Sequence, residues 1–529
     1  MFKNLWLKIK GVLAKMGLIQ SVQSVSDASR LLIDSEFYNK ISDWEAMYQG
    51  EPSWQNDRWQ DIAGNPRNRK VKSLQMPKIL AKKMAGLVFN QKATITISDK
   101  VKPGEAKTDD DDTTNPANQF IQDVLNDNYF YHNCERYLEY MFATGGMVMR
   151  WYVFNGHIKI RFASADSFFP ISQDENGVTE CVIASKFVDS GNNYTLLEYH
   201  LQDDTNYIIK NELYKSNSST GDELGIRVPL STLYGNSLKD ETHYPRSVYS
   251  RPTFVYLKPN LANNFDLDSP LGISIFGNAT DTLHELDQAF DMLGQEMKMG
   301  KRRIVAPDYM LQTVKDAGSG QRRYYIDTDN PAFMKFHAQD SANANIQGPK
   351  DITLGLRNDT FINTINSLLD IVAAQTGFSA GTFSYNNSQG LETATGVISR
   401  NSDTYQSKNS HETIIEDGIR NMCISILELG KAAGLYSGET DEDVTVDFDD
   451  SIAQDRNENA DYYLKMNGNK PLMSQREAIK KANNLTDKGA DEMLNAIHEE
   501  NSQGDINDIL GNEGNSSEDN QNNSKDGDK

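Results

Sequence analysis

The sequence predicts an α+β fold, and three observations support that prediction. Apolar residues recur at three- and four-residue steps through Ile275 to Met299 and again through Thr353 to Thr376, which is typical of helices with one buried face. Several strand candidates lie together between residues 147 and 214. Two of them flank Asn155-Gly156, a dipeptide that is the strongest short-range signal of a β-hairpin.

Composition limits the classes to which the protein can belong. A chain of 529 residues exceeds the size at which one hydrophobic core stops growing, so several domains are expected. The net charge of -22 disfavours tight binding to DNA, although an acidic protein can still surround DNA. Cys134, Cys181 and Cys423 lack metal-binding spacing and are expected to be reduced core residues. No apolar run is long enough to span a membrane.

The N-terminal part is expected to be mainly helical. Met1 to Ile19 is basic and amphipathic, which favours a docking helix and leaves a membrane-surface helix as the alternative. Ile41 to Trp59 is rich in aromatic residues, which are expected to be buried against a neighbouring helix rather than to stack on bases. Lys70 to Phe89 is the most basic segment and fits either an ordinary surface helix or a contact with DNA or a partner. Lys92 to Ser98 alternates as a strand.

An antiparallel sheet is expected after the next helix, which covers Phe120 to Phe142. Before that helix, Val101 to Asn118 is predicted to be a solvated loop, because its contiguous run Asp109 to Asp112 lacks the spacing of a calcium site. The predicted strands are Met147 to Phe154, His157 to Phe162, Gly177 to Val188, Tyr194 to Leu201 and Tyr207 to Tyr214.

The helix predicted over Ile275 to Met299 would be about 37 Å long, at about 1.5 Å per residue. Its apolar seam predicts lengthwise packing against a near-parallel partner. The acidic residues outside the seam are Asp281, Glu285, Asp287, Asp291 and Glu296. The pattern leaves two interpretations open, a solvated helix surface and the lining of a channel.

A small basic β unit, with strands at Lys301 to Pro307 and Arg323 to Ile326, is predicted between the two long helices. After the second helix, Gly377 to Gly390 is rich in Gly, Ser and Asn, which predicts a long mobile loop. The helix that follows, Glu392 to Lys431, has a polar first half, which indicates contact with a neighbouring element.

The C-terminal part is predicted to be helical and then disordered. Ser474-Gln475-Arg476-Glu477 is a capping box, which fixes the start of one helix. Ser502 to Lys529 is too polar to bury apolar area. The ordered elements expected before it are a strand at Asp443 to Phe448 and helices at Ser451 to Met466, Ser474 to Asn484 and Thr486 to Glu500.

The sequence contains no P-loop, dinucleotide fingerprint, HExxH, nucleophile-elbow or kinase motif. His132, His157 and His200 lack metal-ligand spacing and are expected to be structural. No catalytic, cofactor-binding or metal-binding residue is therefore predicted, and a hydrolase acting on nucleic acid is the weakest of the functional alternatives.

Several segments together resemble the portal protein of long-tailed double-stranded-DNA phages of Gram-positive hosts. The resemblance covers about Ile33 to Glu500. The phrases that carry it are Trp44-Glu45-Ala46-Met47-Tyr48-Gln49-Gly50, Met84-Ala85-Gly86-Leu87-Val88-Phe89-Asn90, Gly377-Phe378-Ser379, Leu391-Glu392-Thr393-Ala394-Thr395 and Ser402-Asp403-Thr404-Tyr405.

The family implies a ring, usually of twelve subunits, at one capsid vertex. Double-stranded DNA passes through it without sequence-specific recognition during packaging and ejection. The implied partners are the terminase large subunit, a head-tail connector, and the major capsid and scaffold proteins. The implied location is the virion, with the host cytoplasm during assembly. The alternative is another minor capsid or tail protein without a DNA channel.

The resemblance also implies a division of the chain into regions. These are 1–60 as an N-terminal helical region, 61–270 as the wing, 271–300 and 353–376 as the stem helices, 301–352 as the clip, 377–390 as the tunnel loop, 391–450 as the long wing helix and a strand, 451–501 as the helical crown, and 502–529 as a disordered tail.

Candidate site residues follow from these regions. The five acidic residues of the first stem helix would line the channel. The tunnel-loop residues are Phe378, Ser379, Thr382, Phe383, Tyr385, Asn386 and Asn387. This loop has no basic residue, so a steric collar is the expected role. The residues expected to bind partners at the clip are Arg302, Arg303, Arg322 and Arg323.

Overall fold

Both helices and antiparallel sheets build the chain, which confirms the α+β class. The computed structural model describes residues 35–60, 64–89, 93–100, 115–175, 177–216, 225–235, 237–300, 355–384, 400–448, 463–467, 472–483, 489–491 and 493–498, and the backbone of five short strands between 304 and 351. The chain divides into two units. The first comprises Met1–Lys100, Thr113–Gly390 and Ser399–Asp449. The second comprises Val101–Asp112, Leu391–Ile398 and Asp450–Lys529.

The described N-terminal part begins with helix α2, Ser35–Gln49, which buries Trp44 as predicted. A 3-10 turn, Ser53–Gln55, then leads into a two-stranded antiparallel hairpin that the sequence did not predict. Its strands are β1 (Asn56–Gln60) and β2 (Pro66–Lys70). Helix α3 (Met76–Val88) follows the hairpin. We call the hairpin together with Val71 and Lys72 the arm. The boundary expected between residues 60 and 61 falls inside it.

The single helix predicted after the acidic loop is two helices, α4 (Pro116–Asp127) and α5 (Phe130–Thr144). The break lies at Asn128 and Tyr129, where Tyr129 has a φ of 48°. The amide of Asn128 bonds to the backbone of the following hairpin, donating to the Ile158 carbonyl oxygen at 2.9 Å. The run Asp109 to Asp112 lies outside the described residues.

A three-stranded antiparallel sheet lies next to α5. Its strands are β4 (Met147–Phe154), β5 (His157–Ser164) and β12 (Phe254–Leu257), in the order β12-β4-β5. Asn155 and Gly156 join β4 to β5 with φ values of 50° and 77°. Two consecutive positive φ values are what a two-residue type I′ hairpin requires, so the predicted hairpin is confirmed.

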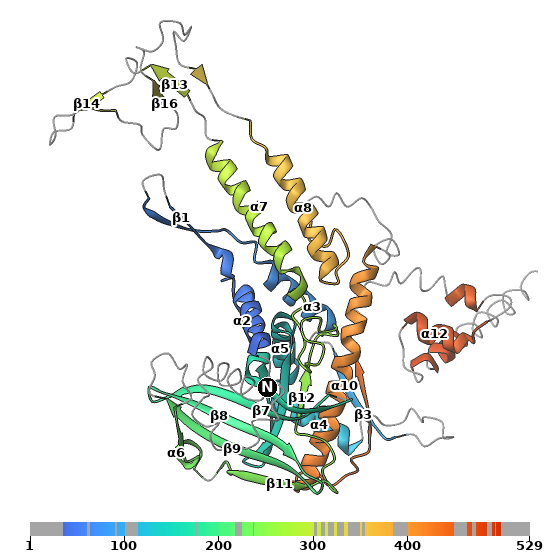
Figure 1. Ribbon diagram of the computed structural model, residues 1–529. Coiled ribbons are helices and arrows are strands. Elements are labelled where there is room, and N and C mark those ends of the chain that lie inside the picture. Colours follow the sequence, from blue (N-terminus) through green and yellow to red (C-terminus); the bar gives the residue numbers. More distant parts are fainter. Residues whose placement is uncertain are drawn as a thin grey trace, which may run out of the picture. The chain divides into compact units, whose positions relative to one another are not determined.

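A larger sheet of six antiparallel strands follows in the chain (Figure 1). Its strands are β6 (Phe168–Asp174), β7 (Gly177–Asp189), β8 (Asn192–Gln202), β9 (Asn206–Ser216), β10 (Ile226–Val228) and β11 (Glu241–Pro245). They run in the order β10-β9-β8-β7-β6, and β11 pairs with β9. The predicted strands are confirmed here. The 3-10 turn Ala165–Ser167 and the short helix α6, Ser231–Tyr234, connect strands.

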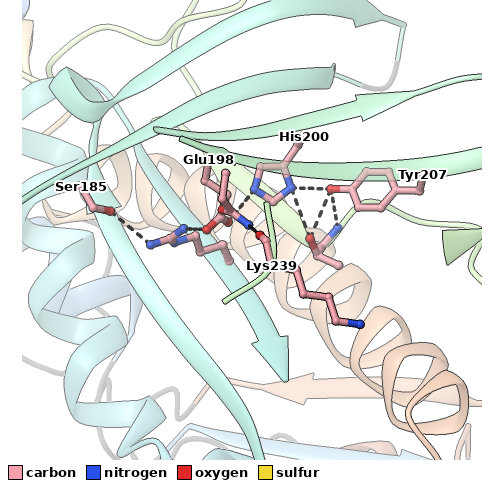
Figure 2. Close-up of polar contacts among 8 residues, drawn as sticks. Ser185, Glu198, His200, Tyr207 and Lys239 are labelled. Atoms are coloured by element: carbon pink, nitrogen blue, oxygen red, sulfur yellow. Dashed lines mark hydrogen bonds and ion pairs between the residues drawn. The ribbon is translucent and has the colours of Figure 1, made fainter. Parts of the chain in front are cut away.

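A buried polar cluster joins this sheet to β4 and to the segment before β12 (Figure 2). Glu198 of β8 is paired with Arg150 of β4 and lies 2.8 Å from Nε2 of His200. His200 Nδ1 lies 2.6 Å from the hydroxyl of Tyr207, and that hydroxyl accepts the backbone N–H of Thr253. The predicted structural role of His200 agrees with these contacts.

Two long helices leave this body side by side and are joined by short strands at their far ends (Figure 1). The 3-10 turn Gly277–Ala279 precedes α7, Thr280–Met299, and α8 covers Asn358–Gln375, so both helices begin five residues later than predicted. The strands between them are β13 (Ile304–Pro307), β14 (Thr313–Lys315), β15 (Arg322–Tyr324), β16 (Phe333–Phe336) and β17 (Lys350–Asp351).

The long helix α10, Ser402–Ala432, packs its C-terminal half into the core. It contacts β12, α3 and α4, and it also covers a strand pair formed by β3, Thr94–Ser98, and β18, Asp443–Asp447. Trp151 and Tyr249 both contact the Ser425 hydroxyl, at 3.0 and 2.7 Å, so polar contacts fix this half of α10 to β4. The apolar stripe predicted for it is confirmed.

In the second unit, helix α12 covers Gln475–Asn483. The backbone N–H of Glu477 donates to the Ser474 hydroxyl at 3.2 Å, which is one half of the predicted capping box. Short helical segments also occur at 463–466 and 493–498. The tail predicted to be disordered, 502–529, and the first 34 residues lie outside the described residues.

Candidate functional site

Helix α7 has three sides with different chemistry. The apolar side carries Leu283 and Leu286, which are buried in one core with Ile365 and Leu369 of α8. The second side contacts the arm. The third side carries Asp281 and is solvent-exposed. Because one residue advances about 100° around a helix, the predicted acidic residues cannot all lie on one side.

Two of the five predicted acidic residues remain on the exposed side. Asp281 and Glu285 are exposed, and neither has a basic partner among the described residues. The role of these two residues in lining a channel stays a prediction.

Asp287 faces the segment that precedes α3 rather than solvent. Its carboxylate accepts the indole N–H of Trp54 at 3.1 Å and the backbone N–H of Leu74 at 3.0 Å. Burial raises its pKa, and these hydrogen bonds only partly oppose the effect. The Trp54 ring also stacks on His284, with ring centroids 4.9 Å apart.

Asp291 joins α7 to the arm. It is paired with Arg69 and accepts the backbone N–H of Lys72 at 3.2 Å and the amide N–H of Gln295 at 2.6 Å. Burial would raise the pKa of Asp291, but the hydrogen bonds, first among them that from Arg69, outweigh burial and lower the pKa. Arg69 reaches Asp57 on the neighbouring strand as well, at 3.1 Å.

Glu296 joins α7 to the start of α8. The guanidinium of Arg357 donates to both of its carboxylate oxygens, at 3.2 and 2.9 Å, and these hydrogen bonds lower the pKa of Glu296. The prediction of an exposed acidic face is therefore wrong for Asp287, Asp291 and Glu296. Their physical role is to bind α7 to segments that are distant in sequence.

The predicted loop is fixed in place at its beginning. Phe378 and Ser379 are each 1% exposed. The Ser379 N–H donates to the Thr404 hydroxyl at 2.8 Å, and the Thr404 N–H donates to the Ser379 hydroxyl at 3.2 Å. The Gly381 N–H donates to Asp370 of α8 at 2.8 Å. These contacts bind the start of the loop to α8 and α10.

The expectation that the loop is mobile from Gly377 onward is therefore wrong for its first residues. Phe378 packs edge to face on Phe383, with ring centroids 5.1 Å apart, and the ammonium of Lys83 lies 5.0 Å from the Phe383 ring. The Thr382 hydroxyl donates to the Ser379 carbonyl oxygen at 2.6 Å. Buried Phe378 cannot contact a ligand in a channel. Tyr385, Asn386 and Asn387 lie outside the described residues.

The predicted clip arginines are described only in part. Arg322 and Arg323 lie on β15, whose backbone pairs with β14, and Arg302 and Arg303 lie outside the described residues. Strand β13 pairs with β16 in parallel and with β17 antiparallel. The structure thus has a small β unit between α7 and α8, and the role of the arginines stays a prediction.

Within the described residues, no cluster of three or more His, Cys, Asp or Glu side chains is arranged to hold a metal ion. No helix in that part of the chain is long and apolar enough to cross a bilayer. The three cysteines are buried and free, as predicted.

The comparisons with known proteins point to one family. A family model described as phage portal protein, SPP1 Gp6-like, matches residues 32–505, which is most of the chain. No curated protein matches the sequence. The matched range includes the arm, α7 and α8, the short strands between them and α10.

Proposed function

Because the chain belongs to the SPP1 Gp6-like family of phage portal proteins, we propose that it assembles into a ring through which double-stranded DNA enters and leaves a capsid. The proposed ring has twelve subunits and occupies one vertex of the virion after assembly in the host cytoplasm. The chain itself acts as a structural conduit and not as a catalyst.

The paired helices α7 and α8 are the observation that carries this proposal. They leave the body together and carry a small β unit at their far ends, while the body carries the larger sheet and α10 (Figure 1). Rods of this kind, repeated around an axis, form the wall of a tube.

We assign the remaining roles to the ends of the rods. The β unit between residues 301 and 352 binds the terminase large subunit during packaging and then the head-tail connector. The assembled ring also contacts the major capsid and scaffold proteins. The loop that begins at Gly377 forms a steric collar, which Phe378 anchors to the body of the subunit.

Electron microscopy of the purified chain tests the proposal. Top views should show rings with a central hole, and twelve copies of the 59.4 kDa chain should give particles of about 710 kDa by mass photometry. Monomers or dimers at every salt and protein concentration would contradict the proposal. Closed particles without a hole would favour a minor capsid protein without a channel.

A further inference from the structure

The arm is exposed on both of its faces. Every described residue of β2 is exposed except Arg69, and Asn56, Asp57, Arg58 and Gln60 of β1 are exposed as well. An isolated two-stranded ribbon is only marginally stable in water. In this subunit the arm is held by the ion pair between Arg69 and Asp291 and by the contacts at its base. A further partner would therefore stabilise it.

The arm and the adjacent side of α7 form a basic surface. Arg58, Lys70, Lys72 and Lys298 are exposed, and none has an acidic partner among the described residues. A groove with a volume of about 290 Å³ brings Lys70, Lys72 and Lys298 together with Asp291. Because Asp291 is already paired with Arg69, these three lysines are free to bind another acidic group.

Gly294 of α7 lies next to the side chain of Lys72 on this surface. A Cβ atom at position 294 would lie 3.0 Å from the Lys72 ammonium nitrogen, which is the far end of a flexible side chain. The arm and α7 therefore approach each other closely at this position.

Acidic residues that could pair with the basic surface lie on another side of α7. Asp281 and Glu285 are exposed and have no described basic partner. At about 100° per residue, Asp281 and Glu285 lie roughly 80–140° around α7 from Asp291 and Lys298. The two charged surfaces therefore face different directions and cannot satisfy one another within one subunit.

We propose that the arm of one subunit docks against the Asp281 and Glu285 side of α7 in a second copy of this chain. Two different, complementary surfaces produce a head-to-tail contact, and such contacts close into a ring when the rotation between copies allows it. The inference rests on the proposed ring and names the surfaces that hold neighbouring stems together.

Charge complementarity favours a second copy over nucleic acid as the occupant. The whole chain carries a net charge of -22, so a copy of it offers acidic surface to the arm. The same net charge disfavours nucleic acid as the occupant, because it repels the phosphates of an approaching duplex.

A charge-reversal experiment in the full-length protein tests this contact. One variant carries Lys70→Glu and Lys72→Glu, and a second carries Asp281→Lys and Glu285→Lys. Each alone places like charges across the contact, so the protein concentration needed for half-maximal ring formation should rise at least about tenfold. Lys186→Glu, an exposed substitution on β7, is the matched control and should leave that concentration unchanged.

An equal mixture of the two variants provides the sharper test. In a head-to-tail ring, the acidic arm of the first variant meets the basic stem of the second, and the basic arm of the second meets the acidic stem of the first. The mixture should therefore form rings at concentrations where neither variant does. The quadruple variant, with both surfaces reversed, should do so alone. Circular dichroism melting curves confirm that all variants fold.

Three results would overturn the inference. Rings from both variants at the wild-type concentration would leave Asp281 and Glu285 as candidates for the channel lining. Unchanged assembly with weaker, salt-dependent DNA binding by the Lys70→Glu and Lys72→Glu variant would make nucleic acid the occupant. If neither the mixture nor the quadruple variant assembled, docking through charge complementarity between the arm and the Asp281 and Glu285 side of α7 would be excluded. Absence of rings from the wild-type chain is a separate result, which overturns the proposed function itself.

Discussion

Glu198 shows how the large sheet accommodates a charge in its interior. Burial alone would raise the pKa of Glu198, but Arg150 and the hydrogen bond from His200 outweigh it and hold the pKa at about 2. The backbone N–H of Thr253 donates to the Tyr207 hydroxyl, which also lies 2.6 Å from His200 Nδ1 and 3.2 Å from the Thr253 hydroxyl. An ionised carboxylate can only accept a hydrogen bond, so Nε2 of His200 carries the proton that is donated to Glu198 (Figure 2).

Replacing Glu198 by Gln should therefore be costly. The substitution keeps the shape but leaves the guanidinium of Arg150 buried without its counter-charge, which costs about 3–5 kcal/mol of unfolding free energy. Urea denaturation at neutral pH measures the change. Asp441→Asn is the control, because Asp441 and Lys100 form an exposed pair at 2.8 Å and its loss should cost less than about 1 kcal/mol. Equal effects of the two substitutions would contradict the prediction.

His411 of α10 should make the unfolding free energy of the chain depend on pH in mild acid. Burial lowers its pKa to about 4 from the usual 6.5, and its Nδ1 accepts the backbone N–H of Asn260 at 3.0 Å. The folded pKa lies below the unfolded one, so the neutral ring stabilises the fold above about pH 6.5, and this contribution is lost as the pH falls towards 4. The loss should reach about 3 kcal/mol.

Unfolding measured at several pH values between 7 and 4 checks this expectation. A His411→Gln variant serves as the comparison, since its side chain does not titrate in that range. The wild-type chain should lose stability more steeply than the variant. Parallel curves would show that His411 does not contribute.

Among the elements, those with internal periodicity were predicted and those held by distant contacts were not. Helix α7, the strands β7 to β9 and the turn at Asn155-Gly156 follow from local pattern, because one buried face or two positive φ values leave a signal in the sequence. The arm buries neither face, so it has no alternation to detect. The break between α4 and α5 also lacks the Pro or Gly that usually marks one.

The anchored start of the loop after α8 leads to a prediction for that element. Phe378→Ala should lower the unfolding free energy by about 3–5 kcal/mol, because it removes a fully buried ring. It should also increase hydrogen exchange at Ser379 and Thr404, whose mutual hydrogen bonds depend on that anchor. Phe383→Ala, at a half-buried position on the same loop, is the control. An equal response to the two substitutions would show that Phe378 is no anchor.

For the whole molecule, the sequence placed the two long helices but not the partners of the charged residues on α7. Asp287 and Asp291 meet Trp54 and Arg69, more than 200 positions away in the chain, and Glu296 meets Arg357 across the β unit. No local pattern encodes such pairings. Angular arithmetic along α7 could have separated Asp287 and Asp291 from Asp281, but not shown what covers them.

The proposed partner-binding role of the β unit between α7 and α8 can be tested without changing either helix. Replacing Arg302, Arg303, Arg322 and Arg323 by Glu should spare ring formation, because all four lie outside α7, α8 and the arm. It should abolish packaging of DNA in an assay with capsids and terminase, since acidic side chains would repel an acidic docking surface. Arg161→Glu on β5 is the control. Normal packaging by the quadruple variant would remove the partner-binding role.

The burial of the three cysteines has a practical consequence for all of these measurements. Cys134, Cys181 and Cys423 are fully enclosed, and burial raises the pKa of each thiol, that of Cys423 to about 12. A thiolate is the species that reacts with maleimides, so the three cysteines of the native protein should not react with them. Met292→Cys, at an exposed position between Asp281 and Glu285 around α7, could then carry a fluorophore while both carboxylates remain, and its emission would report whether a neighbouring molecule covers that side of the helix.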